Sequence, residues 1–346
     1  MTTLPPWSDL AGRIEFKVID SVALKGNPLG DPESRPVVVY LPPGYDTAPD
    51  RRYPSVYVIQ GYTGQVGMWF NRDPFRQPYP ELVDALFRND EAPPVIVVFV
   101  DAWTSYGGSQ YLDSPATGRY HTYLCEDVVP WVDEHYRTVP DRDHRAITGK
   151  SSGGYGAMIT PMLRPDLFGA LATHAGDALF DVCYRTQFPY LARLLRDHYD
   201  GSYLNFLDDF GQRIAGTREG DLLLIEVYGY SAAYSPGSDG VPQVPFDVHG
   251  SVLPDIWSQW QEWDPVEMAT RAHNAEALRS MRGIWIDAGS RDEWYLDLGA
   301  LAFRQAVQTA GVPDERVHFE LFDATHGRIE YRYPLALSWL AHRLSE

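Results

Sequence analysis

Residues Gly149–Gly153, which read Gly-Lys-Ser-Ser-Gly, place a serine between two glycines. The short apolar run Arg145–Thr148 precedes them, and the helix-compatible stretch Tyr155–Leu163 follows. A serine on a sharp turn between a strand and a helix exposes its hydroxyl, and flanking glycines leave room for that turn. We therefore interpret Ser151 as a nucleophile. A phosphate-binding loop is the weaker interpretation, because such a loop has glycine where His144 stands.

A serine nucleophile needs a base that takes its proton and an acid that orients the base. Asp292 follows the apolar run Gly283–Ala288, and His326 follows the run His318–Phe322. In α/β-hydrolases these groups occur in the order serine, acid, histidine, each on a loop after a strand. Ser151, Asp292 and His326 keep this order and predict a catalytic triad.

Other residues compete for two of these roles. Glu293 adjoins Asp292 as an alternative acid, whereas Asp287 and Asp297 fit a strand end and a helix start. His174 also follows a strand, but it lies upstream of the acid and better suits a pocket-lining or structural role. A Ser-x-x-Lys mechanism fails, because none of the three lysines has serine three positions earlier.

Backbone N–H groups must also face the oxyanion that forms during acyl transfer. Ser152 follows the nucleophile, and Tyr62 lies in the glycine-rich loop after the apolar run Tyr53–Ile59, so their N–H groups are the predicted donors. The residues that we expect to bind substrate are Gly61, Trp103, His174, Tyr230 and Trp257. We expect no metal and no cofactor, because the chain lacks His-Glu-x-x-His and paired cysteines.

Apolar runs alternate with helix-compatible stretches through most of the chain. This alternation predicts an α/β fold with a mainly parallel sheet flanked by helices, which two early strands begin in antiparallel fashion. Residues 1–346 would form a single α/β-hydrolase domain. This alternation is lost over about residues 178–282, where aromatic side chains are frequent. We expect this insertion to cover the active site and to favour an aromatic or bulky substrate, although the aromatics could instead form its own core.

The composition limits the partners. A net charge of −18 argues against nucleic acid and anionic membranes and favours a small neutral molecule, so the expected substrate is a small-molecule ester. The chain has no long apolar run or signal-peptide pattern and only two cysteines, Cys125 and Cys183, which we expect to be buried. We therefore expect a cytoplasmic protein, and association into a homo-oligomer stays open.

Several segments resemble the esterase D-like branch of the α/β-hydrolases, which is grouped with enterochelin esterases, S-formylglutathione hydrolases, feruloyl esterases and mycolyltransferases. The similar segments are Val38–Tyr45, Gly61-Tyr62, Ser114–Tyr120, Gly149–Gly156, Gly289–Glu293 and Thr325–Gly327. The resemblance implies carboxylic-ester hydrolysis with Ser151 as nucleophile, Asp292 as acid, His326 as base and Tyr62 at the oxyanion hole. Gln60 departs from it, since many relatives have histidine there.

The sequence therefore predicts a serine carboxylic-ester hydrolase that acts through an acyl-enzyme on Ser151. One alternative is an acyltransferase that passes the same acyl group to an alcohol or a sugar. The other is a noncatalytic binding protein on a hydrolase scaffold.

Overall fold

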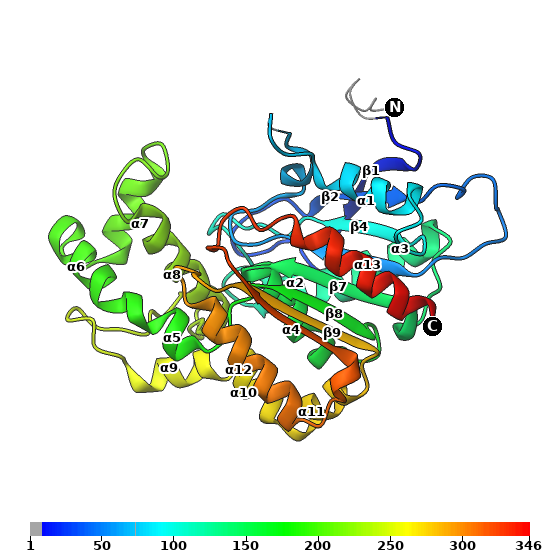
Figure 1. Cartoon of the computed structure of the whole chain (residues 1–346). Helices are drawn as coiled ribbons and strands as arrows, with labels where there is room; N and C mark the ends of the chain where they lie inside the picture. Colours follow the sequence, from blue (N-terminus) through cyan, green and yellow to red (C-terminus); the bar gives the residue numbers. More distant parts are fainter. Residues whose placement is uncertain (1–8, 73) are drawn as a thin grey trace.

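The computed structural model describes residues 9–72 and 74–346 and is built around an eight-stranded sheet. The strands are β1 (Arg13–Asp20), β2 (Ser34–Leu41), β3 (Ser55–Ile59), β4 (Ile96–Val100), β7 (Arg145–Lys150), β8 (Ala170–His174), β9 (Gly283–Gly289) and β10 (Val317–Phe322). Their order is β1-β2-β4-β3-β7-β8-β9-β10 (Figure 1). Strand β2 pairs antiparallel with β1 and β4, and every other pair is parallel. The predicted sheet is confirmed.

Helices cover both faces of the sheet, because its strands alternate apolar side chains between two sides. Val38 and Tyr40 of β2 share a core with α1 (Tyr79–Arg88) and α13 (Arg332–Ser345). Val37 and Val39 belong to the opposite core. That core includes α3 (Val129–His135), α4 (Ser152–Leu163), α11 (Ala272–Arg279) and α12 (Leu296–Thr309). The sheet is therefore buried between two helical layers.

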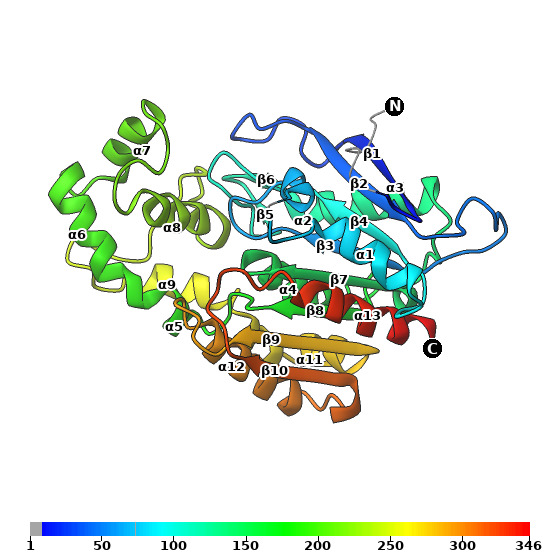
Figure 2. The same ribbon diagram turned by 45° about the horizontal axis from the view of Figure 1, so that its top comes forward.

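The insertion consists of α5 (Phe180–Cys183), α6 (Phe188–Tyr199), α7 (Tyr203–Gly211), α8 (Asp221–Tyr234) and α9 (Pro254–Gln261). Figures 1 and 2 show these helices projecting beyond one end of the sheet, on the left of both views. Helix α10 (Pro265–Thr270) and α11 pack against α4, so they belong to the layer that covers the sheet. The insertion is thus shorter than the predicted range 178–282.

Aromatic side chains form a core inside the insertion. Trp260 is fully buried, and its ring lies near those of Phe188, Trp257 and Tyr234. The Trp260 indole N–H donates to Ser235 Oγ at 2.8 Å. Many of these aromatics therefore stabilise the insertion itself, which was one of the two roles considered for them.

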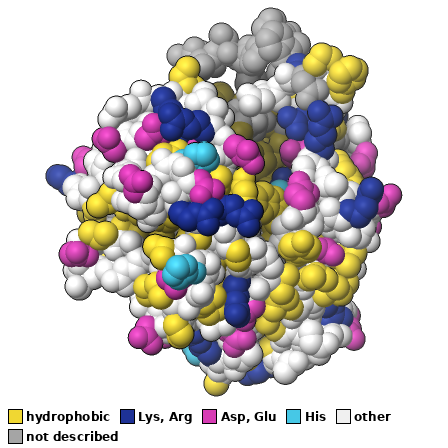
Figure 3. All heavy atoms as spheres, turned by 90° about the vertical axis from the view of Figure 1, so that its left-hand side faces the viewer, with side chains coloured by type: hydrophobic (Ala, Val, Ile, Leu, Met, Phe, Trp, Pro, Cys, Tyr) yellow, Lys and Arg dark blue, Asp and Glu magenta, His cyan; other side chains and the backbone are white. Residues whose placement is uncertain are grey.

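The side of the molecule that carries the insertion presents hydrophobic side chains among charged ones (Figure 3). Exposed large apolar residues of the insertion are Leu204, Ile214, Leu222, Val241 and Val248. Cys125 and Cys183 are both buried, as predicted. Across residues 9–72 and 74–346, none of the helices combines the length and the apolar character needed to cross a bilayer.

Candidate active site

Ser151 occupies the turn between β7 and α4, with φ 58° and ψ −129°. This backbone conformation is sparsely populated for a residue with a side chain, and it confirms the predicted strained turn. The Ser151 N–H donates to the carbonyls of His174, at 3.0 Å, and Ala175, at 3.1 Å. A Cβ on Gly149 would lie 2.3 Å from the carbonyl oxygen of Gly153, so the close turn requires glycine there.

Asp292 and His326 are brought together from the loops after β9 and β10. His326 Nδ1 donates to Asp292 Oδ2 at 2.8 Å, which leaves Nε2 free to accept a proton. The Asp292 carboxylate is buried, and its other oxygen accepts the backbone N–H of Trp294 at 2.9 Å. Glu293 instead accepts the backbone N–H of His326 at 2.9 Å. The geometry thus favours Asp292 over Glu293 as the partner of the imidazole.

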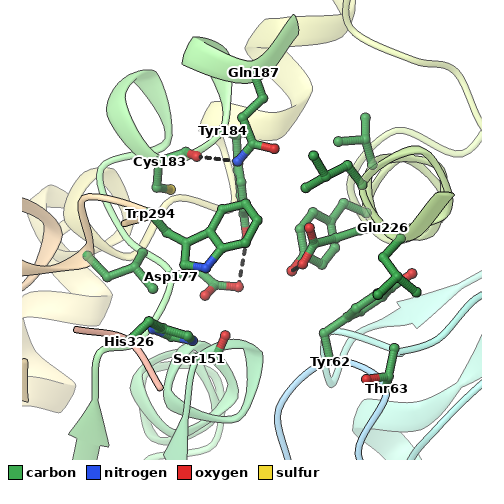
Figure 4. A pocket seen from close by; sticks show the side chains of 15 residues that line it. Tyr62, Thr63, Ser151, Asp177, Cys183, Tyr184, Gln187, Glu226, Trp294 and His326 are labelled. Carbon is green, nitrogen blue, oxygen red and sulfur yellow. Dashed lines mark hydrogen bonds between the residues drawn. The ribbon is translucent and has the colours of Figure 1, made fainter. Parts of the chain in front are cut away.

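Ser151 and His326 line the same cavity of about 250 Å³. Figure 4 shows the imidazole beside the serine side chain, whose hydroxyl points into the cavity. Both residues are described, and the structure records no hydrogen bond between their side chains. In enzymes without substrate this bond is often long and shortens when substrate binds. The position of His326 beside Ser151 therefore suits a base that takes a proton from the serine hydroxyl.

The N–H groups of Tyr62 and Ser152 lie near Ser151 and are available for an oxyanion. Neither donates a hydrogen bond to another described residue. Ser152 opens α4, where N–H groups have no partner within the helix. The Tyr62 loop approaches the turn so closely that a Cβ on Gly61 would lie 3.0 Å from the Lys150 carbonyl oxygen. The loop that carries the Tyr62 N–H therefore lies against the turn that carries Ser151 and Ser152.

Side chains behind the Tyr62 loop fix its position. The Tyr62 hydroxyl donates to the Tyr106 carbonyl at 2.5 Å, and the Thr63 N–H donates to the Gly107 carbonyl at 3.2 Å. The Asp101 carboxylate accepts the N–H of Val66 at 2.9 Å. These bonds hold the Tyr62 loop in one position.

Of the residues predicted to bind substrate, Tyr230 lines the cavity. Gly61 and Trp103 line a separate recess of about 10 Å³, which is too small for a substrate. The face of Trp103 instead contacts the guanidinium of Arg35, 4.7 Å from the ring centre. Gly61 and Trp103 therefore both lie outside the cavity that contains Ser151.

The predictions for His174 and Trp257 are corrected by their burial. His174 is fully buried, and its Nδ1 donates to Asp287 Oδ1 at 2.7 Å. This fits the structural role considered for His174 and excludes contact with a substrate. Trp257 packs on Phe188, and its indole N–H donates to Asp181 at 3.2 Å. Trp257 therefore belongs to the core of the insertion.

The cavity also contains residues that the sequence did not single out. They are Thr63, Asp177, Cys183, Tyr184, Gln187, Leu222, Leu223, Glu226, Val227, Trp294 and Leu296. Asp177 follows β8, so it shares with Asp292 a position just after a parallel strand. Glu226 is the one carboxylate in the otherwise apolar segment Leu222–Val227. Both features are visible in the sequence and mark the two acids as unusual.

A chain of polar contacts joins these two acids beside the nucleophile. Asp177 accepts the Ser152 hydroxyl at 3.1 Å, and Ser152 Oγ lies 3.1 Å from the Tyr230 hydroxyl. Tyr230 in turn donates to Glu226 at 2.9 Å. Burial raises the pKa of Asp177 and raises the pKa of Glu226 to about 8, although its bond from Tyr230 acts in the opposite direction.

No cluster of three or more His, Cys, Asp or Glu side chains suited to a metal occurs in the described part of the chain. The sequence profile of the family described as "Putative esterase" matches residues 32–336. The match covers most of the chain. The chain belongs to this putative esterase family.

Curated relatives match part of the chain. The chain is 26% identical over 134 residues to an endo-1,4-beta-xylanase/feruloyl esterase of Xylanibacter ruminicola, which covers 38% of the chain and 18% of the relative. It is 27% identical over 149 residues to an esterase of Mycobacterium tuberculosis, covering 41% of the chain and 29% of the relative. The matches thus span less than a third of these relatives.

Solved structures share the fold of this putative esterase. A ferulic acid esterase superposes with a TM-score of 0.61 at 19% identity, covering 97% of this chain and 100% of the other. An S-formylglutathione hydrolase from Agrobacterium tumefaciens gives 0.55 at 16% identity, with 97% of each chain covered. These similarities establish the α/β-hydrolase fold.

Proposed function

We propose that the protein is a serine carboxylic-ester hydrolase. The observation that carries this proposal is the hydrogen-bonded Asp292–His326 pair beside Ser151, whose backbone adopts the strained turn of a nucleophile. Membership of an esterase family supports the same reaction.

The reaction would begin when His326 Nε2 takes the Ser151 proton while the serine oxygen attacks the ester carbonyl carbon. The N–H groups of Tyr62 and Ser152 would stabilise the oxyanion, and Asp292 would stabilise the imidazolium. As the tetrahedral intermediate collapses, the bond to the alcohol oxygen breaks and His326 protonates that oxygen. An ester on Ser151 remains.

The second half of the reaction would release the acid. His326 would take a proton from water, whose oxygen attacks the acyl carbon, and the same N–H groups would hold the second oxyanion. His326 would then return the proton to Ser151 as the acid leaves. No cofactor takes part in this scheme.

Two measurements test the proposal. A fluorophosphonate should label Ser151 in the wild-type protein and leave Ser151→Ala unlabelled, because only an activated serine reacts. Ser151→Ala should also lose at least about a thousandfold in kcat on p-nitrophenyl acyl esters. Hydrolysis by Ser151→Ala at the wild-type rate would contradict the proposal. A wild-type protein that stays unlabelled would favour a noncatalytic binding protein.

We propose that the substrate carries a bulky group, and a panel of esters tests this. Four aromatic residues, Tyr62, Tyr184, Tyr230 and Trp294, line the cavity, which supports a bulky substrate group. Feruloyl and acetylated-sugar esters belong in the panel beside a series of acyl lengths.

Acyl transfer to an alcohol would use the same acyl-enzyme as hydrolysis, so product analysis with competing alcohols separates the two reactions. The cytoplasmic location stays a prediction.

A further inference from the structure

The cavity beside Ser151 is acidic and lacks a balancing cation. Asp177 and Glu226 both line it, whereas no Lys or Arg is among the described residues of its wall. Figure 4 shows the Glu226 carboxylate directed into the cavity from α8, across from Trp294 and above Ser151. A carboxylate in such a place is costly unless something pairs with it.

The two acids differ in how many hydrogen bonds they accept. Asp177 accepts three, all on Oδ2, from the Tyr184 hydroxyl at 2.8 Å, the Ser152 hydroxyl at 3.1 Å and the Gln110 amide at 3.5 Å, and its Oδ1 takes none from the described residues. Glu226 accepts one, from Tyr230, on Oε1. Its Oε2 takes no hydrogen bond from the described residues. Glu226 therefore offers a free acceptor to whatever occupies the cavity.

Aromatic rings complete the surroundings of this acceptor. Tyr62 and Tyr230 meet edge to face with ring centres 5.4 Å apart, and Tyr184 lies 4.9 Å from Tyr230. Trp294 lines the opposite wall. Aromatic faces next to a carboxylate attract alkylammonium groups through both the ring quadrupole and the charge. The net charge of −18 would draw cations toward the protein from a distance.

We propose that the substrates of this cavity carry an alkylammonium group and that Glu226 selects them. The inference rests on the proposed function, since it concerns the cavity into which Ser151 points. Oε2 of Glu226 would accept or face the cation, and the aromatic walls would surround its methyl or methylene groups. Glu226 is thus a specificity-determining residue that need not touch the reacting atoms.

The groups around Glu226 predict how this recognition depends on pH. Tyr62 from the loop after β3, Asp177 and Tyr230 face it, and His326 lies across the cavity. Since the pKa of Glu226 is raised to about 8, about a tenth of the molecules carry its charge at pH 7 and about nine-tenths at pH 9. The affinity for a permanent cation should therefore rise about tenfold between these values.

Calorimetry on the Ser151→Ala protein tests the inference without catalysis. Choline and 3,3-dimethylbutan-1-ol have the same shape and differ in one charge. At pH 9 we expect choline to bind about ten times tighter than 3,3-dimethylbutan-1-ol. Glu226→Gln should abolish this preference and its pH dependence. Glu276→Gln, on the exposed surface of α11, removes the same charge elsewhere and should change neither. Equal binding of the two probes, no binding of choline, or a preference that survives Glu226→Gln would overturn the inference.

Kinetics on the active enzyme provide the second arm. The acetate esters of the two probes place the cation on the alcohol, and p-nitrophenyl 4-(trimethylammonio)butanoate and 5,5-dimethylhexanoate place it on the acyl group. We expect kcat/KM to favour the cationic member of one pair about tenfold, and Glu226→Gln to bring the ratio of the two members close to one. Hydrolysis with no preference in either pair would overturn this inference and leave the proposed function standing. Failure of the proposed function would instead show as no hydrolysis and no fluorophosphonate labelling, with choline binding intact.

Discussion

The Glu293 carboxylate accepts the backbone N–H of His326 at 2.9 Å, so this acid holds the histidine loop and not the histidine ring. Its neighbour Asp292 binds the ring through Nδ1. Two adjacent acids therefore fix one residue at two places, the backbone and the imidazole. Their contributions to catalysis should differ because only one of them stabilises the charge that forms on the ring.

Exchanging the two acids for amides should expose this difference. Asp292→Asn should lower kcat about a thousandfold to ten-thousandfold, because an amide favours the wrong imidazole tautomer. Glu293→Gln can still accept the His326 N–H and should lower kcat by less than about tenfold. Hydrolysis of a p-nitrophenyl ester by both purified variants measures the effect. Equal losses, or a larger loss for Glu293→Gln, would reverse the assignment.

A methyl group at Gly61 should impair the oxyanion site. The added Cβ would meet the Lys150 carbonyl oxygen at 3.0 Å and Ser151 Cβ at 3.4 Å, so the loop carrying the Tyr62 N–H must move. We expect Gly61→Ala to lower kcat about a hundredfold, the effect of losing one donor, with little change in melting temperature. Gly67→Ala is the matched control, because nothing lies within 4 Å of a Cβ there. If both variants keep full activity, the loop does not supply a donor.

Most of the sheet and the three proposed catalytic groups could be predicted from the sequence, because both rest on local patterns. Strand β4 is a continuous apolar run, β9 is apolar apart from Asp287, and Ser151, Asp292 and His326 each follow a strand. Pairing of parallel strands then brings their carboxyl ends together at one edge. The order of these residues along the chain was enough to group them.

The insertion could not be predicted in the same way. Most residues of helix α8 are buried, so its sequence lacks the polar face that reveals a surface helix. That helix carries Glu226 and Tyr230, and their place in the cavity depends on how the insertion folds over the sheet. Trp257 and Tyr230 look alike in the sequence as aromatics near the site. Only tertiary packing separates a core residue from one that lines the cavity.

The buried Asp287 should contribute to stability in a pH-dependent manner. Although burial opposes it, His174, Trp285 and Arg332 together hold the pKa of Asp287 below its ordinary value. A lowered folded-state pKa gives stability that is present above the unfolded pKa of about 4 and is lost as pH falls through the folded value. Asp287→Asn should cost about 3–5 kcal/mol at pH 7, since it removes the buried charge that pairs with Arg332 and leaves this guanidinium with Glu320 alone.

Urea unfolding at several pH values measures this contribution. The difference in unfolding free energy between wild type and Asp287→Asn should be constant from pH 7 to about pH 5 and should shrink below about pH 4. Asp239→Asn, in the loop after α8, provides a control at a more exposed acid. A difference that grows as the pH falls would mean that the wild-type carboxyl is not held in its charged form.

Paired variants of Tyr230 and Trp257 separate binding from stability. Tyr230→Phe removes the hydroxyl that contacts Ser152 and Glu226, and we expect kcat/KM to fall about tenfold while the protein stays folded. Trp257→Phe loses the bond to Asp181 and some packing, which should lower the unfolding free energy by about 1–3 kcal/mol and leave kcat/KM within about twofold. Steady-state kinetics and thermal unfolding on both variants check the contrast. If Trp257→Phe lowers kcat/KM as much as Tyr230→Phe does, Trp257 contacts the substrate.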